Sequence, residues 1–180
     1  MLSAQGFLEH LHTEKFLHKE QRHKHVIHKL VLSGGFFGLG QLTNNANLFH
    51  LFLYIVPFIS LIHDVYIFSE HFKVHRVGVF IRKVMACPPV SNEELAWEKF
   101  AQEHPEKNAK WASFAYTILI TIFSALAVYY SDYVESGALA GLYYYWVFLC
   151  VFATLAVFGF SATLQNKIDK IEGKTKDNNP

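Results

Sequence analysis

One long apolar stretch, from Leu48 to Lys83, limits what this chain can fold into more than any other feature. Its first part, 48–68, contains 21 residues without a Lys or Arg. A helix of about that length crosses the roughly 30 Å hydrocarbon core of a bilayer. Ionisable side chains interrupt the stretch at His50, His63 and Asp64, and such groups at membrane depth usually serve a function. The stretch therefore predicts a membrane-spanning helix that carries polar side chains and continues into a basic segment.

Three further apolar runs bring the number of predicted spans to four, at about 27–43, 47–68, 111–131 and 139–164. The connections near 41–47 and 131–137 carry no Lys or Arg, whereas all 16 of these residues fall within 15–29, 73–110 and 167–176. Connections rich in Lys and Arg stay on the cytoplasmic side of a membrane. The sequence therefore predicts an all-α, polytopic membrane protein with four transmembrane helices and cytoplasmic N- and C-termini.

The predicted organisation has three parts. Residues 1–29 form a cytoplasmic, His-rich, basic amphipathic helix near the lipid headgroups. Residues 30–165 form the membrane domain, with a cytoplasmic connection at 70–110, and residues 166–180 form a cytoplasmic tail. The first span is the shortest, because its uncharged stretch, 30–42, falls short of the roughly 20 residues that a spanning helix needs. The span must therefore start before Lys29, whose long side chain can reach the interface. Its Gly34 and Gly38 have the small-xxx-small spacing that lets a neighbouring helix approach closely.

Polar or helix-disturbing residues recur on one face of the second and third predicted spans, at spacings of three, four or seven. We call this set the polar lane; its members are His50, Pro57, Ser60, Asp64, Ser113, Thr117, Thr121 and Ser124. Such a lane either joins helices through hydrogen bonds or lines a pore. Asp64 either serves an ion pathway or pairs with Lys29, Arg76 or a histidine.

The histidines suggest an alternative chemistry. His71 and His75 are four residues apart on a predicted helix and could supply half of a zinc site, with His63 as a further candidate ligand. A bis-histidine haem would take one histidine from each of two helices. The leading interpretation includes no cofactor, with zinc or haem as the alternative. No catalytic constellation is found in the sequence, so an enzyme is not predicted.

The basic segment after the second span is expected to act at the cytoplasmic face. Arg76, Arg82 and Lys83 are predicted to contact headgroups or to form part of a gate. The expected partners are the lipid bilayer, further copies of this chain and a protein at the cytoplasmic face. Nucleic acid is not expected, because the basic face is small.

The segment 57–82, PFISLIHDVYIFSEHFKVHRVGVFIR, resembles a pattern found in small multi-spanning bacterial membrane proteins, some of which act as effectors of antiphage defence. The resemblance implies a homo-oligomer that breaches or depolarises the bacterial inner membrane on a cue, and it brings no catalytic residues.

A single bundle of four helices has little room for a water-filled bore, so a pore would lie between protomers. The leading functional hypothesis is therefore a homo-oligomeric pore or membrane-permeabilising effector. The alternatives are a metal- or haem-binding membrane protein and a non-catalytic accessory subunit of a membrane complex.

Overall fold

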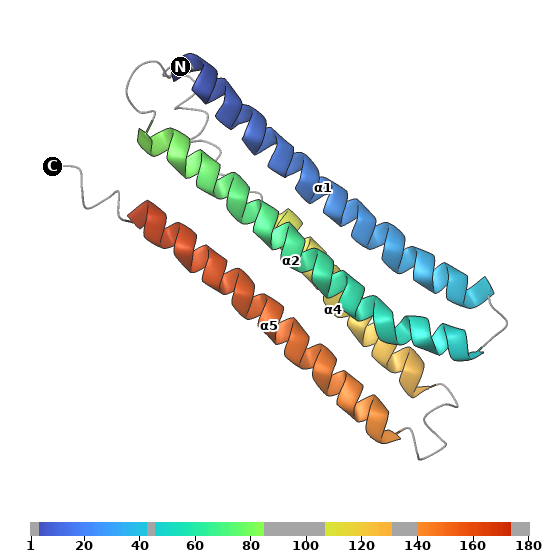
Figure 1. Cartoon of the computed structure of the whole chain (residues 1–180). Coiled ribbons are helices and arrows are strands. Elements are labelled where there is room, and N and C mark those ends of the chain that lie inside the picture. The colour runs from blue at the N-terminus through green and yellow to red at the C-terminus, as the bar shows by residue number, and fades with distance from the viewer. Residues whose placement is uncertain (1–3, 43–45, 85–106, 131–139, 174–180) are drawn as a thin grey trace.

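The computed structural model describes residues 4–42, 46–84, 107–130 and 140–173, and these segments are helical almost throughout. The helices are α1 (Ala4–Leu42), α2 (Ala46–Val84), α4 (Lys107–Tyr129) and α5 (Ala140–Gly173). Figure 1 shows them as long rods that run side by side, with α1 and α5 on opposite sides of α2. The first residues of α1 and the last residues of α2 and α5 lie at the same end of the bundle.

Three of these helices are long and apolar enough to cross a membrane: the segments are Phe49–Ile81, Trp111–Tyr129 and Gly141–Lys170. The all-helical architecture is therefore confirmed, and three of the four helices are compatible with the predicted spans. Helix α1 falls short of the same length-and-composition standard, because charged and His residues fill its first two thirds. The side of the membrane on which the termini lie stays a prediction.

Helices α1 and α2 are both much longer than a bilayer is thick. Each contains 39 residues, which is about 58 Å at the helical rise per residue. Residue 29, the predicted junction between a headgroup helix and the first span, lies within one continuous helix. In the same way α2 continues from its apolar part to Val84, and Pro57 lies inside it without ending it. The two helices therefore form a hairpin that is longer than a bilayer is thick.

The apolar core is divided into three clusters along the bundle. Leu8 and Leu11 of α1 pack on Val77 and Ile81 of α2 at the Ala4 end. A second cluster joins α2, α4 and α5 near the other end, through Leu53, Val128, Tyr143, Trp146 and Cys150. A third joins the same helices near the middle, through Leu61, Phe68, Phe114 and Val157. Helix α2 takes part in all three clusters, so the other helices are arranged around it.

The outer surface of α4 and of the first two thirds of α5 is largely apolar, which is compatible with contact to lipid tails. Large apolar side chains stay exposed there, among them Leu119, Ile122, Leu126, Phe148, Phe152 and Leu155. The second half of α1 shows the same character at Leu30, Val31 and Leu39. A methyl group placed on Gly34, Gly35 or Gly38 would meet nothing within 4 Å in the described part of the chain. The close helix approach predicted at Gly34 and Gly38 is therefore not made among the described helices.

Candidate functional site

An ion pair between Lys29 of α1 and Asp64 of α2 lies buried in the bundle. The Lys29 ammonium Nζ is 2.7 Å from the Asp64 carboxylate Oδ1. The exposed fractions of the two side chains are 1% and 0%. A charge removed from water in this way is tolerated only when it is paired and hydrogen-bonded. The prediction that Asp64 pairs with a cationic side chain is confirmed, and the partner is Lys29.

Helix α4 supplies the remaining acceptors of the Lys29 ammonium group. Lys29 Nζ donates to the backbone carbonyl of Ser113 at 2.6 Å and to the Ser113 hydroxyl Oγ at 3.1 Å. The Tyr116 ring contributes a cation–π contact, with its centroid 5.5 Å from Nζ. A lysine ammonium has three N–H donors, so Asp64 and the two oxygens of Ser113 satisfy all of them.

The Asp64 carboxylate is also fully engaged. The Ser113 hydroxyl donates to Oδ1 at 3.1 Å, and the Thr117 hydroxyl donates to Oδ2 at 2.5 Å. Ser113 and Thr117 are four residues apart, so they lie on one face of α4. Lys29, Asp64, Ser113 and Thr117 therefore form one connected set, which we call the buried ionic cluster. One helical turn away from this cluster, Ser33 of α1 lies beside Ser60 of α2. Their hydroxyls are 3.1 Å apart, and both side chains are buried.

The polar lane predicted from the sequence is only partly brought together. Ser60, Asp64 and Ser113 contact side chains of α1, and Thr117 joins them through its hydrogen bond to Asp64. Thr121 donates instead to the Thr117 carbonyl of its own helix, at 2.8 Å. The Ser124 hydroxyl is buried and has no hydrogen-bond partner among the described residues.

Pro57 is buried in α2, and the helical turn before it contacts α5. The indole N–H of Trp146 donates to the Tyr54 carbonyl at 3.1 Å, three residues before the proline. A proline inside a helix removes a backbone hydrogen bond and disturbs the carbonyls of the preceding turn. The carbonyl that loses its backbone donor at Pro57 is that of Leu53, and Trp146 donates from outside the helix to the next carbonyl of the same turn. His50, also near this end of α2, is half-buried and its ring lies near Phe49.

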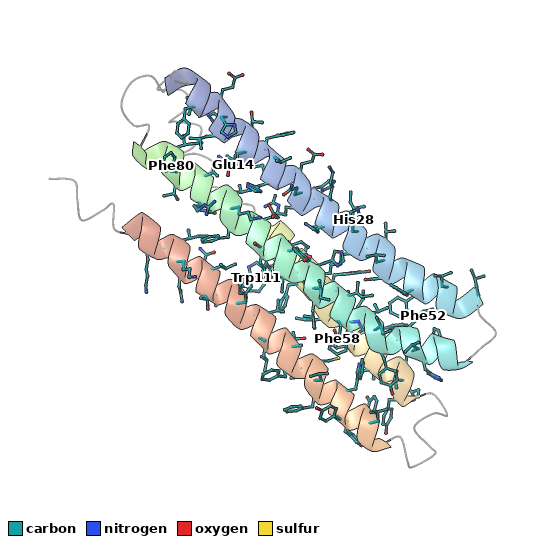
Figure 2. All side chains as sticks on the ribbon, in the orientation of Figure 1. Glu14, His28, Phe52, Phe58, Phe80 and Trp111 are labelled. Carbon is teal, nitrogen blue, oxygen red and sulfur yellow. The ribbon has the colours of Figure 1, made fainter. Side chains whose placement is uncertain are left out.

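The contact face of α1 was missed by the sequence analysis. Along this helix the residues facing α2 recur at alternating spacings of three and four: Leu8, Leu11, Lys15, His18, Arg22, His25 and Lys29. None of them is fully exposed. This spacing is the heptad pattern of packed helices, but most of the positions are polar, which hid the pattern from a search for apolar residues. The ends of the α1–α2 contact are marked in Figure 2 by Phe80, against Phe7, and by Phe52, against Phe36.

A tier of titratable groups follows the cluster toward the Ala4 end of the bundle. His18 Nδ1 and Lys73 Nζ each lie 2.6 Å from the Glu70 carboxylate. Arg22 contacts His71, with 3.4 Å between the two nitrogens. The His18–Glu70 and Arg22–His71 contacts connect α1 to α2 beyond the buried ionic cluster, and Lys73 pairs with Glu70 within α2.

His25 belongs to the same tier. Its ring stacks on Tyr66 at a centroid distance of 5.1 Å and meets the edge of His63 at 6.2 Å. Burial, together with the neighbouring His63, lowers the pKa of His25 below its usual value. Neutral His25 is therefore the form that the packed helices favour.

The candidate metal ligands do not come together as a three-residue site. His71 and His75 have ring centroids 5.7 Å apart, whereas His63 donates from Nδ1 to the Ile59 carbonyl of its own helix at 2.9 Å. Within residues 4–42, 46–84, 107–130 and 140–173, no three His, Cys, Asp or Glu side chains are placed to hold a metal ion.

The predicted gate residues lie beyond the tier. Arg76 is exposed, and the side chains of Arg82 and Lys83 lie outside the part of the chain that the structure describes. The connection around 85–106 lies outside it as well.

Comparisons with known proteins give no match: no family model, curated protein or solved structure is significantly similar to this chain. The functional argument therefore rests on the residues and contacts described above.

Proposed function

We propose that this protein is an integral membrane protein of four spans, with both termini cytoplasmic, that forms an ion-conducting pore closed by the Lys29–Asp64 pair. Helix α1 would provide the fourth span through its second half, whose exposed side chains Leu30, Val31 and Leu39 suit lipid. Lys29, the charge that weakens this span by composition, is neutralised by Asp64. The cost of placing it in the membrane is correspondingly reduced.

The observation that carries the proposal is the buried ionic cluster between α1, α2 and α4, two of which are long and apolar enough to cross a membrane. Asp64 follows the start of the apolar stretch at Leu48 by 16 residues, or about 24 Å along a helix. In a hydrocarbon core of about 30 Å, this places the pair near the cytoplasmic mouth of the span. Burying an ion pair seldom increases stability over an apolar pair of similar size. A functional role, such as holding a gate closed, accounts better for its presence.

The closed state follows from the direction of the polar lane. Ser60, Asp64 and Ser113 contact Ser33 or Lys29 of α1, and Thr117 contacts Asp64, so in this conformation the Lys29 side chain occupies the lane. Conduction would require α1 to move away from α2 and α4, which would expose the same hydroxyls and the Asp64 carboxylate to water. The tier at His18, Arg22 and His25 joins α1 to α2 at the end where a cytoplasmic signal would act.

The open face of α1 supports assembly into an oligomer. Gly34 and Gly38 are exposed, and no described residue packs against them. Small residues four apart are typical of contacts between membrane helices. We propose that copies of the chain associate through this face. The resemblance to antiphage effectors would make the trigger a signal of infection and the location a bacterial inner membrane; both stay predictions.

Ion flux across liposomes containing the purified protein tests the proposal. Asp64→Asn removes the carboxylate that pairs with Lys29, so we expect a potassium leak at least several-fold above that of the wild type. Asp169→Asn is the matched control, because Asp169 is an exposed carboxylate on α5 and its variant should conduct like the wild type. Equal flux through the Asp64 and Asp169 variants, at equal incorporation, would remove the pair from the gate and contradict the proposed function.

A further inference from the structure

The oxygen atoms around the Lys29 ammonium form a cation site that α2 and α4 build without any atom of α1. Lys29 Nζ contacts Asp64 Oδ1, the Ser113 carbonyl and the Ser113 hydroxyl at 2.7, 2.6 and 3.1 Å. The Tyr116 ring lies 5.5 Å away on a further side. The Thr117 hydroxyl binds the other carboxylate oxygen and so fixes the orientation of the carboxylate. Only the occupant of the site belongs to α1.

The chemistry of this site selects one class of ligand. A single carboxylate supplies one negative charge, which balances one positive charge and repels anions. The distances from Nζ to the oxygens exceed the about 2.0–2.1 Å that Mg²⁺ demands and reach beyond the about 2.3–2.6 Å of Ca²⁺. They are the lengths of charge-assisted N–H···O hydrogen bonds. An aromatic face within about 6 Å favours an organic ammonium further.

We propose that Asp64, Ser113 and Thr117, with the Tyr116 ring, form a binding site for a small primary ammonium ion, and that Lys29 occupies this site as a tethered competitor. This inference rests on the proposed function and specifies it: the open pathway would select small monovalent cations at this point. When α1 moves away, a free cation takes the place of the Lys29 ammonium and keeps Asp64 paired.

The test uses the full-length Lys29→Ala protein in detergent, which removes the tethered ammonium and leaves every ligand oxygen of the site. Thermal unfolding is followed in methylammonium chloride and in tetramethylammonium chloride at equal ionic strength. Tetramethylammonium has no N–H donor and is larger than the space that the Lys29 ammonium fills. Methylammonium at ten times its Kd should shift the folding equilibrium by about elevenfold, with saturation, whereas tetramethylammonium should give no saturable shift.

Two matched proteins show whether the effect belongs to the site. The wild type should show no preference for methylammonium, because Lys29 already fills the site. Lys29→Ala/Asp64→Asn should show none either, because the carboxylate is gone. If Lys29→Ala does not purify in a folded form, recovery of monodisperse protein in the two salts becomes the measurement. Equal recovery or equal unfolding of Lys29→Ala in both salts overturns the site.

The flux assay separates this inference from the proposed function. Selective stabilisation of Lys29→Ala by methylammonium, with no flux through any variant, would support the site and contradict the pore. Flux through Asp64→Asn, with no methylammonium selectivity in Lys29→Ala, would support the pore and overturn the site.

Discussion

Replacing both members of the buried ion pair with apolar residues should be far less harmful than replacing either one. In Lys29→Met the Asp64 carboxylate keeps two hydroxyl donors, from Ser113 and Thr117, but loses its only cation among the described contacts. In Asp64→Leu the Lys29 ammonium keeps the two oxygens of Ser113 but no negative charge. Each change leaves an unpaired charge in the bundle.

The size of the effect follows from the burial of both groups, which are at most 1% exposed. Removing one partner of such a pair costs about 3–5 kcal/mol. At about 1.36 kcal/mol per tenfold, this lowers the folding equilibrium constant by two to nearly four orders of magnitude. The double variant Lys29→Met/Asp64→Leu leaves no buried charge, so it should lie within about 1–2 kcal/mol of the wild type or be more stable. The coupling energy of the cycle should therefore exceed about 3 kcal/mol.

The free energy of unfolding can be measured for the four proteins by SDS titration from mixed micelles, followed by far-ultraviolet circular dichroism. Ser124→Ala is a useful control. It removes a buried hydroxyl that has no hydrogen-bond partner among the described residues, so it should change stability little. Additive losses, with the double variant as unstable as the sum of the two single variants, would refute the reasoning, because the two charges would then not be compensating one another.

Two further predictions concern contacts outside the cluster. Trp146→Phe keeps an aromatic ring in the core but leaves the Tyr54 carbonyl without its indole donor, so the free energy of unfolding should fall by about 1–3 kcal/mol; an unchanged SDS midpoint would contradict this role. The second prediction concerns pH: because the pKa of His25 is lowered by burial and by His63, the unfolded chain binds more protons between that pKa and about 6.5. The contribution of neutral His25 to the free energy of unfolding is therefore complete above about pH 6.5. It is lost as the pH falls through the lowered pKa. His25→Phe keeps a ring against Tyr66 without a titrating group, so its SDS midpoint should depend less steeply on pH between about 5 and 7; equal slopes for variant and wild type would contradict the assignment.

Local sequence patterns were enough to predict the apolar helices and the polar faces of α2 and α4. A span is recognised from its own length and apolarity, and Phe49–Ile81, Trp111–Tyr129 and Gly141–Lys170 satisfy both conditions. The face shared by Ser60 and Asp64, and the face shared by Ser113 and Thr117, follow from helical periodicity within a single element. These properties need no knowledge of the neighbouring helices, so the sequence by itself determined them.

Which faces meet was decided only by the tertiary structure. Lys29 and Asp64 are 35 residues apart, and Lys29 and Ser113 are 84 apart, so no local periodicity relates them. From the sequence, Asp64 had several candidate partners, and the polar lane could equally face another copy of the chain. The alternating spacing from Leu8 to Lys29 was visible but has polar members, so it did not register as a packing face. Packing of α1 onto α2 placed the only buried lysine among the described residues at the depth of Asp64, because a charge inside the bundle is tolerated only where an opposite charge meets it.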